Sequence, residues 1–403
     1  MNSHKKILII NQYYPPDRSA TAGILEKIVK VLSLKYHITV LSGRPSYLAI
    51  NRQEWKLIKV LRAKHVKIMR VGSTAFTRYK IIKRVSNYLS FLCLSLPVAL
   101  MTRSDVFFSM TDPPLAGFIG AIAAKIRKKP FIYYIQDLHP DMALAAGMIK
   151  EGKLSKIWHR LHLYVLNSAN RLIVIGDDMK DRILSKGINE NKICVIRHGT
   201  STHHKLQRYD SDLIKKIRNK FAFTFIHSGN IGGYGAWESI VRAIRMIDND
   251  KIGFIFIGEG QYKKKLLEMS EGIENIVFLP FQPREKFASV LMAGDVQIIT
   301  IRNSLEGLVV PSKIYPILGA NKPILGICSN KSDTARIIDK YQCGLVADPD
   351  SAESIAEAVL RFYKLKDRLS VFEKNSQLAA NDYRQARLIE KLSVEIECCQ
   401  ENS

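Results

Sequence analysis

Short, continuous apolar runs recur along almost the whole chain and are separated by stretches with helical spacing. Six runs fall in the first half, at residues 7–10, 37–41, 105–110, 131–135, 171–175 and 192–196. Amphipathic segments lie between several of them, such as residues 24–34, where apolar side chains recur every three or four positions. Strands that are apolar on both faces and alternate with helices indicate a parallel sheet covered on both sides. The sequence therefore predicts an α/β fold.

This alternation stops near residue 198 and then begins again. Residues 199–220 are polar and have no strand pattern, which makes them the expected linker. A second series of runs follows, at residues 223–229, 252–260, 275–281, 296–301, 322–327 and 344–348. A domain averages about 150 residues, so a chain of 403 residues suits two tandem Rossmann-like domains with a cleft between them. We place them at residues 1–200 and 201–381, and expect a terminal helix within residues 382–403.

The two halves of the chain differ strongly in charge. Lys and Arg number 61 against 37 Asp and Glu, a net charge of +24, of which residues 1–200 carry +21. The densest basic stretch is residues 51–84, with eleven Lys and Arg and one acidic residue, Glu54. Such an excess indicates an anionic partner, although a solvated face is the alternative. Nucleic acid is not expected, because no RNP, KH or zinc-finger pattern accompanies the cations.

An uncharged segment of eighteen residues, Val85–Thr102, follows this stretch and reaches the length of a membrane span. Its polar residues and its proline are Ser86, Asn87, Ser90, Ser95 and Pro97. They favour a helix that is partly buried or lies at a membrane surface over one that crosses it. With the preceding cations, the segment predicts attachment to an anionic membrane surface, where each well-placed cation contributes about 1 kcal/mol.

The cysteines and the N-terminal run indicate a cytoplasmic protein. Six cysteines show no CxxC spacing and no regular framework, which argues against zinc and against a disulfide scaffold. The run Ile7–Ile10 follows two lysines, as in a signal peptide, but it has only four residues and no small-residue cleavage site follows. We interpret it as the first buried strand, and expect a peripheral protein on the inner face of the plasma membrane.

Ligands bind outside the carboxyl ends of parallel strands, so function is expected in the loops that follow the strands. Residues 11–23 lead from the first strand into a helix expected to start near Gly23, where backbone amides and the helix N-terminus favour an anion. The loop SGNIGGYG at residues 228–235 surrounds Asn230 with glycines and could wrap a diphosphate. A plain turn is the alternative for each loop.

A third loop, at residues 257–266, contains Gly258, Glu259 and Gly260 between a strand and a helix. A carboxylate would repel a phosphate, so Glu259 is expected to meet a sugar hydroxyl or to cap its own helix.

The fourth loop lies within residues 303–325 and contains Glu306 and Gly307. Pro311, Ser312 and Lys313 are expected to begin a helix whose first turn binds an anion, with Lys313 adding charge. One preorganised donor of this kind can lower a barrier by about 3 kcal/mol. An ordinary surface lysine is the alternative.

In the first half, TDPP (111–114) and QDLHPD (136–141) end strands and hold carboxylates and an imidazole near the expected cleft. Asp137 or His139 could orient an attacking hydroxyl. A helix-capping Asp and a packed His are equally compatible with the pattern.

Taken in order, these motifs resemble the retaining glycosyltransferases of GT-B fold, family 4, close to the bacterial enzymes that build surface polysaccharides. The motifs are NQYYPPDRSATAG, LSGRP, TDPPLAG, YYIQDLHPD, GNIGGYGAWES, IGEGQYKKKL, NIVFLPFQPREKF and GLVVPSKIYPILGANKPILG. The resemblance implies a nucleotide-sugar donor, expected to be UDP-linked, on the second domain and a lipid-linked saccharide acceptor on the first. It further implies retention of the anomeric configuration, no metal or other cofactor, and a C-terminal helix that crosses back to the first domain.

The resemblance also implies which residues form the site. The candidate catalytic residues are Asp137, His139, Glu306 and Lys313. The candidate donor-binding residues are Gly23, Gly229, Asn230, Gly232, Gly258, Glu259, Gly260, Phe281, Gly307, Val309 and Ser312. Two positions depart from the family pattern, since Pro316 stands where many members have a second glutamate and Gln136 where members often have a histidine.

Two other functions fit the same architecture. A nucleotide-sugar 2-epimerase shares the two-domain fold, but it has no use for a basic first half. A non-catalytic binding subunit of a polysaccharide assembly complex would be consistent with Pro316 in place of the second glutamate.

Overall fold

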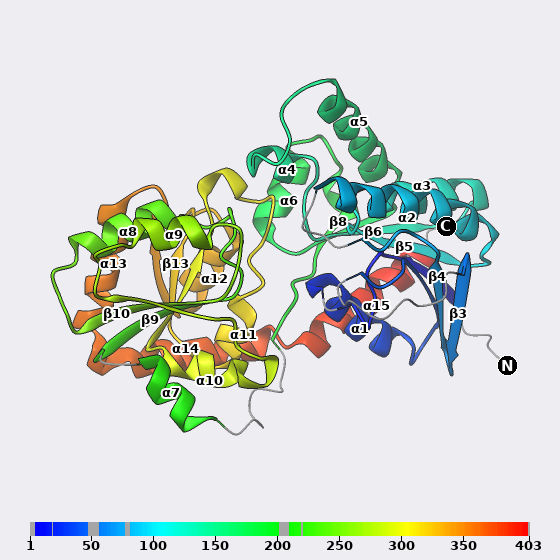
Figure 1. Ribbon diagram of the computed structural model, residues 1–403. Coiled ribbons are helices and arrows are strands. Elements are labelled where there is room, and N and C mark those ends of the chain that lie inside the picture. Colours follow the sequence, from blue (N-terminus) through cyan, green and yellow to red (C-terminus); the bar gives the residue numbers. More distant parts are fainter. Residues whose placement is uncertain are drawn as a thin grey trace.

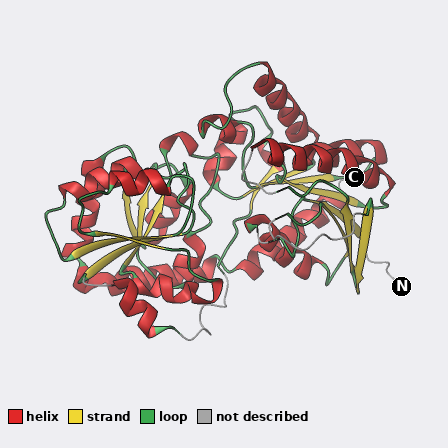
Figure 2. Ribbon diagram, viewed as in Figure 1, coloured by secondary structure: helices red, strands yellow, loops and turns green. Residues whose placement is uncertain are grey.

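The computed structural model describes residues 5–17, 19–46, 56–76, 81–200, 209–218 and 221–401. Two lobes lie side by side, and each contains one sheet with helices on both faces (Figures 1 and 2). The expected α/β class with two Rossmann-like domains is confirmed.

The N-terminal lobe contains an eight-stranded sheet in the order β3-β4-β2-β1-β5-β6-β7-β8. Its strands are β1 (Lys6–Ile10), β2 (His37–Ser42), β3 (Ile58–Ala63), β4 (Val66–Val71), β5 (Val106–Met110), β6 (Phe131–Ile135), β7 (Arg171–Val174) and β8 (Ile193–Val195). All neighbours are parallel except β3, which runs antiparallel to β4 at the edge.

Helices cover both faces of this sheet (Figure 1). They are α1 (Ala20–Leu32), α2 (Ile81–Met101), α3 (Ala116–Arg127), α4 (Asp141–Ala145), α5 (Lys153–Ser168) and α6 (Asp177–Leu184). Helices α2 and α5 each pack against α3 on one side, and α1 lies on the other.

The C-terminal lobe contains a six-stranded, fully parallel sheet in the order β11-β10-β9-β12-β13-β14. Its strands are β9 (Phe223–Ser228), β10 (Ile252–Ile257), β11 (Ile276–Leu279), β12 (Val296–Thr300), β13 (Ile324–Ile327) and β14 (Gly344–Ala347). Its helices are α7 (Ser211–Arg218), α8 (Trp237–Met246), α9 (Lys263–Met269), α10 (Phe287–Ala293), α11 (Ile314–Gly319), α12 (Asp333–Tyr341), α13 (Ala352–Lys364) and α14 (Leu369–Asp382).

The apolar runs form strands because both of their faces are buried. Every residue of β5, β6 and β10 is buried, so neither face of these strands meets water. In each sheet the strand order reverses once, between β1 and β5 and between β9 and β12. A crevice opens beyond the strand ends at such a reversal. The loops after these four strands therefore flank the natural binding position of each lobe.

Two local features differ from the sequence-based expectation. Residues 58–71 form the β3–β4 hairpin, although this part of the chain had shown only a basic stretch. All six side chains of β3 are exposed, so no buried apolar face signals the strand. Helix α1 begins at Ala20, capped by the Ser19 side chain, rather than near Gly23. Of the basic residues in the 51–84 stretch, Arg52, Arg78 and Lys80 lie outside the described residues.

The chain crosses between the lobes twice, and the two crossings are paired. The Thr200 amide donates to the carbonyl of Tyr383 (2.6 Å), and the Gln385 amide donates to the carbonyl of Thr200 (3.0 Å). Helix α14 packs against α11 and α12 of the C-terminal lobe, whereas α15 (Gln385–Glu401) packs against α1 and β6 of the other lobe. Leu388, Leu392 and Ile396 join the N-terminal core.

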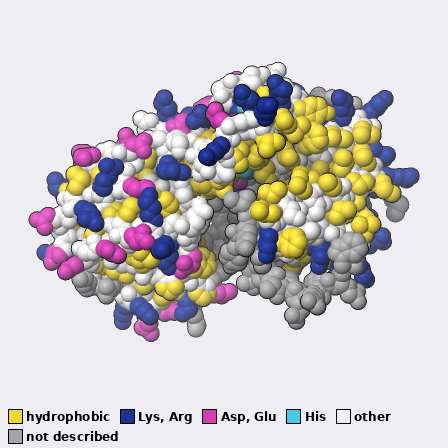
Figure 3. Space-filling model, turned by 45° about the horizontal axis from the view of Figure 1, so that its top comes forward, with side chains coloured by type: hydrophobic (Ala, Val, Ile, Leu, Met, Phe, Trp, Pro, Cys, Tyr) yellow, Lys and Arg dark blue, Asp and Glu magenta, His cyan; other side chains and the backbone are white. Residues whose placement is uncertain are grey.

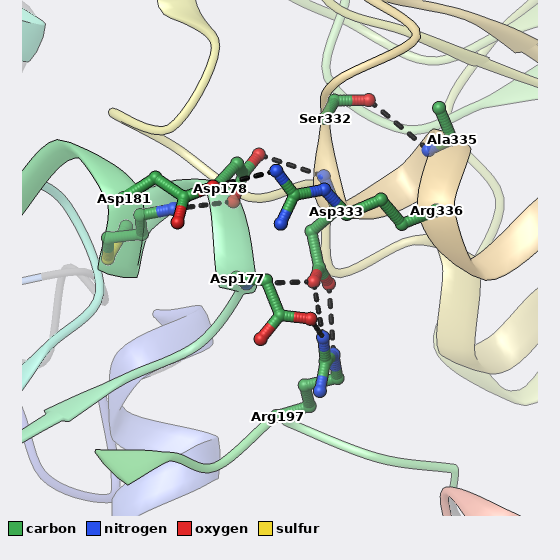
Figure 4. Close-up of polar contacts among 9 residues, drawn as sticks. Asp177, Asp178, Asp181, Arg197, Ser332, Asp333, Ala335 and Arg336 are labelled. Carbon is green, nitrogen blue, oxygen red and sulfur yellow. Dashed lines mark hydrogen bonds and ion pairs between the residues drawn. The ribbon is translucent and has the colours of Figure 1, made fainter. Parts of the chain in front are cut away.

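A charged cluster also joins the lobes, where the N-termini of α6 and α12 face each other (Figure 4). The Asp333 carboxylate accepts from the Asp177 amide, and the Asp178 carboxylate accepts from the Asp333 amide, both at 2.9 Å. Arg197 donates to Asp333 and Asp177, and Asp333 is fully buried. Each lobe thus supplies a carboxylate that satisfies the first amides of a helix in the other.

Candidate functional site

The carboxyl end of β9 carries the glycine-rich loop, and close packing fixes its backbone. The Gly229 amide donates to the carbonyl of Ile257 (2.8 Å), and the Ile231 amide donates to that of Glu259 (2.9 Å). A Cβ at Gly258, whose φ is +152°, would lie 1.8 Å from the Gly229 carbonyl oxygen. Only glycine allows this approach. The loops after β9 and β10 therefore form one rigid unit.

Lys313 lies directly over this unit. A Cβ at Gly229 would meet the Lys313 Cε at 2.8 Å and its Nζ at 3.0 Å, so the missing side chain makes room for the ammonium. The Nζ is 2.9 Å from Nε2 of His227, the fifth residue of β9. Burial lowers the pKa of Lys313 to about 8. The candidate donor-binding residue Gly229 and the candidate catalytic residue Lys313 are thus brought together.

Other residues expected on the donor side surround this point at differing depths. Asn230 is exposed at the loop tip, and its amide nitrogen would lie 2.8 Å from a Cβ at Gly232. A Cβ at Gly260 would lie 2.2 Å from the Ile231 carbonyl oxygen, which again requires glycine. Phe281 follows β11 and is 65% exposed, which leaves its ring accessible.

Glu259 does not cap its helix. Its carboxylate pairs with Lys263 (2.6 Å), one turn along α9. Its backbone carbonyl carries the contact to Ile231 described above.

The segment before α11 differs from expectation in its secondary structure. The helix begins at Ile314, so Ser312 and Lys313 form a turn that precedes it, and the helix has only six residues. The expected helix start at Pro311 to Lys313 is therefore wrong, whereas anion binding at Ser312 and Lys313 stays a prediction.

Glu306, Gly307 and Val309 lie where the lobes meet. The Glu306 carbonyl accepts from Arg182 Nε of α6 (3.1 Å). Gly307 has a φ of +68°, and a Cβ there would lie 2.6 Å from the Asp178 carbonyl oxygen. Val309 forms a β-bridge with Asp137 of the other lobe. The loop after β12 therefore meets the N-terminal lobe directly.

The facing edge of the N-terminal lobe carries two carboxylates at the ends of β5 and β6. Asp112 accepts a hydrogen bond from the Thr21 hydroxyl (2.9 Å). Burial, and then the nearby Asp112 charge, raise the pKa of Asp137 to about 7. A carboxyl group in this state can take up or release a proton near neutral pH.

His139 is packed rather than exposed. Its ring stacks on Trp158 of α5 with centroids 5.6 Å apart, and it is 9% exposed. Burial, followed by the positive charge of Arg84, lowers the pKa of His139 to about 4. The imidazole is therefore neutral at physiological pH, and its contact with Trp158 favours the alternative of a packed histidine.

Gly23 does not offer its amide to a ligand. It is the fourth residue of α1, and its amide donates to the Ser19 carbonyl (3.2 Å). The expected helix start near Gly23 is wrong, because the helix begins three residues earlier and uses this amide internally; donor binding at Gly23 stays a prediction.

Three residues near the site were not selected from the sequence. His227 lies within a strand, Asp112 was noted only as part of TDPP, and Arg84 was counted only among the surface cations. Strand and helix periodicity identify none of them, because each becomes relevant only through contacts with distant parts of the chain. Two carboxylates that end neighbouring strands were the one available signal for Asp112.

The two edges differ chemically. The C-terminal edge combines a rigid glycine loop with a lysine, which suits a diphosphate. The N-terminal edge has a carboxyl group of raised pKa, which suits a neutral hydroxyl. Within the described residues, no group of three or more His, Cys, Asp or Glu side chains is placed to hold a metal ion.

The chain is similar to proteins that are described as glycosyltransferases. Residues 210–380 match the family described as "Glycosyl transferases group 1". Over 265 residues the chain is 28% identical to "Probable glycosyltransferase WbjE" of Pseudomonas aeruginosa, covering 64% of this chain and 66% of WbjE. It is 20% identical over 249 residues, 59% of this chain, to an Escherichia coli protein whose name describes a "colanic acid biosynthesis glycosyl transferase WcaI". The match spans 61% of that relative, so both alignments cover just under two thirds of the relative's length.

The fold is shared over the full length with a solved structure. The crystal structure of Anabaena HepE in complex with UDP-glucose superposes with a TM-score of 0.71, at 16% identity, over 98% of this chain and all of that one.

Proposed function

We propose that the protein is a retaining glycosyltransferase of surface-polysaccharide synthesis with the GT-B fold, because residues 210–380 match the group 1 glycosyl transferases and the chain shares its fold with HepE. The donor is a nucleotide sugar, UDP-linked, and the acceptor is a lipid-linked saccharide. The observation that carries the proposal is the Lys313 ammonium lying over the Gly229 loop, in a protein whose other lobe holds the Asp137 carboxyl group of raised pKa.

In the proposed reaction, the donor diphosphate lies against the amides of the Gly229 loop and the Lys313 ammonium. Charge grows on the diphosphate as its bond to the sugar breaks, and a fixed cation stabilises that charge without having to reorganise. The departing diphosphate takes the proton of the acceptor hydroxyl on the same face of the sugar. Asp137 orients that hydroxyl, and Glu306 contacts the sugar. No metal or other cofactor takes part.

Helix α2 supports a position at an anionic membrane on the cytoplasmic side. It contains one segment, Ile82–Met101, that is long and apolar enough to cross a membrane by length and composition, and 28% of it is buried. Ile82 and Met101 are each 84% exposed, and Leu89 is 55% exposed. Apolar side chains cover much of the N-terminal lobe in Figure 3, with Lys and Arg at its margins. An apolar helix face flanked by cations suits the interface between headgroups and acyl chains.

The decisive experiment is a transfer assay with a panel of labelled UDP-, GDP- and dTDP-sugars and a lipid-linked acceptor extract. We expect label to enter the lipid fraction from one donor class, and Lys313→Ala to abolish most of that transfer. Incubation with the donor alone tests the 2-epimerase alternative, which would convert the sugar without an acceptor. A protein that binds a nucleotide sugar but neither transfers nor hydrolyses it would be a binding subunit, and this result would contradict the proposal.

A further inference from the structure

We propose that His227 is the positioning residue for Lys313, a neutral acceptor that holds the ammonium over the Gly229 loop without cancelling its charge. This inference rests on the proposed function of the same site. It assigns a role to a strand residue that no motif selects.

His227 lies in a closed aromatic environment. It is 2% exposed on β9, where it pairs in register with Phe256 of β10. Its ring meets that of Trp237 edge to face with centroids 4.9 Å apart, and lies 6.5 Å from the ring of Phe256. These contacts leave Nε2 directed at Lys313 and hold the imidazole in one place. A buried strand position of this kind would ordinarily be apolar, as Phe225 and Phe254 are.

The chemistry of the pair explains why a histidine stands there. An ammonium has three donors and no acceptor, so the proposed role requires Nε2 to accept the hydrogen bond and the imidazole proton to be on Nδ1, which is buried and has no hydrogen-bond partner among the described residues. Burial, and then the Lys313 charge, lower the pKa of His227 well below its usual value, so the ring stays neutral. A carboxylate in the same place would hold the ammonium more strongly, but it would neutralise it and repel a diphosphate. A neutral acceptor fixes the position and leaves the positive charge available.

Gly229 completes the arrangement. A side chain at this position would collide with Lys313. The ammonium is therefore confined between the imidazole and the loop backbone, 2.9 Å from the first. Because the diphosphate is proposed to bind to that same loop, small displacements of Nζ would reach the reacting group.

The test compares two substitutions of His227 that differ in whether the new side chain can accept a hydrogen bond. His227→Phe fills the aromatic environment but offers no acceptor, whereas His227→Gln can present a carbonyl oxygen to Lys313. We expect His227→Phe to lower kcat and to weaken inhibition by inorganic diphosphate, each by roughly 10- to 100-fold, the scale seen when a reacting group is displaced by about 1 Å. His227→Gln should restore at least part of both. His162→Phe, at another buried histidine that contacts Tyr133 in the other lobe, is the matched control and should change neither.

Thermal unfolding and the Lys313→Ala variant separate the outcomes. If His227→Phe and His227→Gln lose activity equally, and in step with a fall in Tm, the residue is structural and the inference is wrong. Wild-type kinetics for His227→Phe would also overturn it, while an inactive Lys313→Ala would leave the proposed function standing. Full activity of Lys313→Ala would instead remove the proposed mechanism itself.

Discussion

The two edges that face each other across the lobes are built in opposite ways. On the C-terminal edge, glycines bring backbone close to backbone, and the charged group over Gly229, Lys313, has a neutral partner. On the N-terminal edge, Asp112 and Asp137 lie close enough for one to raise the pKa of the other. The first edge keeps a positive charge available, and the second keeps a carboxyl group partly protonated. An anion and a hydroxyl would therefore be bound on different lobes.

The largest effect should come from removing the cation. Lys313→Ala takes away the charged side chain that lies over Gly229, so kcat should fall by about 100- to 1,000-fold, as for the loss of one preorganised donor. Acceptor binding, which belongs to the other edge, should be nearly unchanged. Steady-state kinetics with each substrate varied in turn measure both. Lys340→Ala, an exposed lysine on α12, is the control.

A result in which Lys313→Ala raised the KM for the acceptor as much as it lowered kcat would contradict the assignment of charges to edges.

The second effect concerns the opposite edge and depends on pH. The pKa of Asp137 is raised from 3.8 to about 7, so the folded protein keeps a proton there in the window between these values that an unfolded chain would release. If the carboxylate orients the hydroxyl, the rate should fall as the pH drops through about 7. Asp137→Asn should lower kcat by about 100-fold. It should also remove the fall in rate on the acidic side of the pH–rate profile, called the acidic limb below.

Asp112→Asn supplies the sharper measurement, because it removes the neighbouring charge and leaves Asp137 in place. The acidic limb should then move to lower pH. The exposed Asp250→Asn is the control. A limb that stays where it was in Asp112→Asn, or that survives in Asp137→Asn, would show that another group titrates.

Sequence patterns anticipate these two edges unequally. Continuous apolar runs predicted most of the strands and the parallel sheets, because a strand that is buried on both faces has apolar side chains at every position. The glycine loop at 228–235 was visible for a similar reason, since closely approaching backbones require glycine at several nearby positions. His227 was not visible, because it lies in a strand and its partner is 86 residues away. The β3–β4 hairpin was missed because its outer strand has no buried face.

Predictions for single positions also failed where contacts with distant residues decide the local structure. Gly23 was expected to start a helix, but Ser19 caps the helix earlier and its side-chain oxygen accepts from the Ala22 amide. His139 was expected near an attacking hydroxyl, but it stacks on Trp158, which is 19 residues away in the sequence. Composition shows which groups are available, whereas their pKa and accessibility depend on contacts that the pattern does not contain.

A third, smaller effect tests whether the basic lobe meets a membrane. The double variant Ile82→Ser and Leu89→Ser removes two exposed apolar side chains of α2, which should weaken binding to vesicles of anionic phospholipid by about tenfold or more. Donor binding to the other lobe should not change. Val371→Ser with Leu378→Ser, on exposed positions of α14 in the C-terminal lobe, is the matched control. Vesicle sedimentation measures the binding, and equal losses for both double variants would contradict docking through α2.

The smallest expected effect is the uptake of a fraction of a proton when the donor binds. This uptake reports on the charge of Lys313 directly. With a pKa of about 8, the free protein carries this ammonium about half protonated at pH 8. A bound diphosphate favours the charged form and raises that pKa, so binding of the nucleotide-sugar donor, whose diphosphate does not titrate between pH 6 and 8, should take up about half a proton at pH 8. Calorimetry in buffers of different ionisation enthalpy measures this uptake. It should vanish at pH 6, where the lysine is already protonated, and also in Lys313→Ala. A proton uptake that persists in Lys313→Ala would come from another group. This result would contradict the proposal that His227 keeps the charge of Lys313 available.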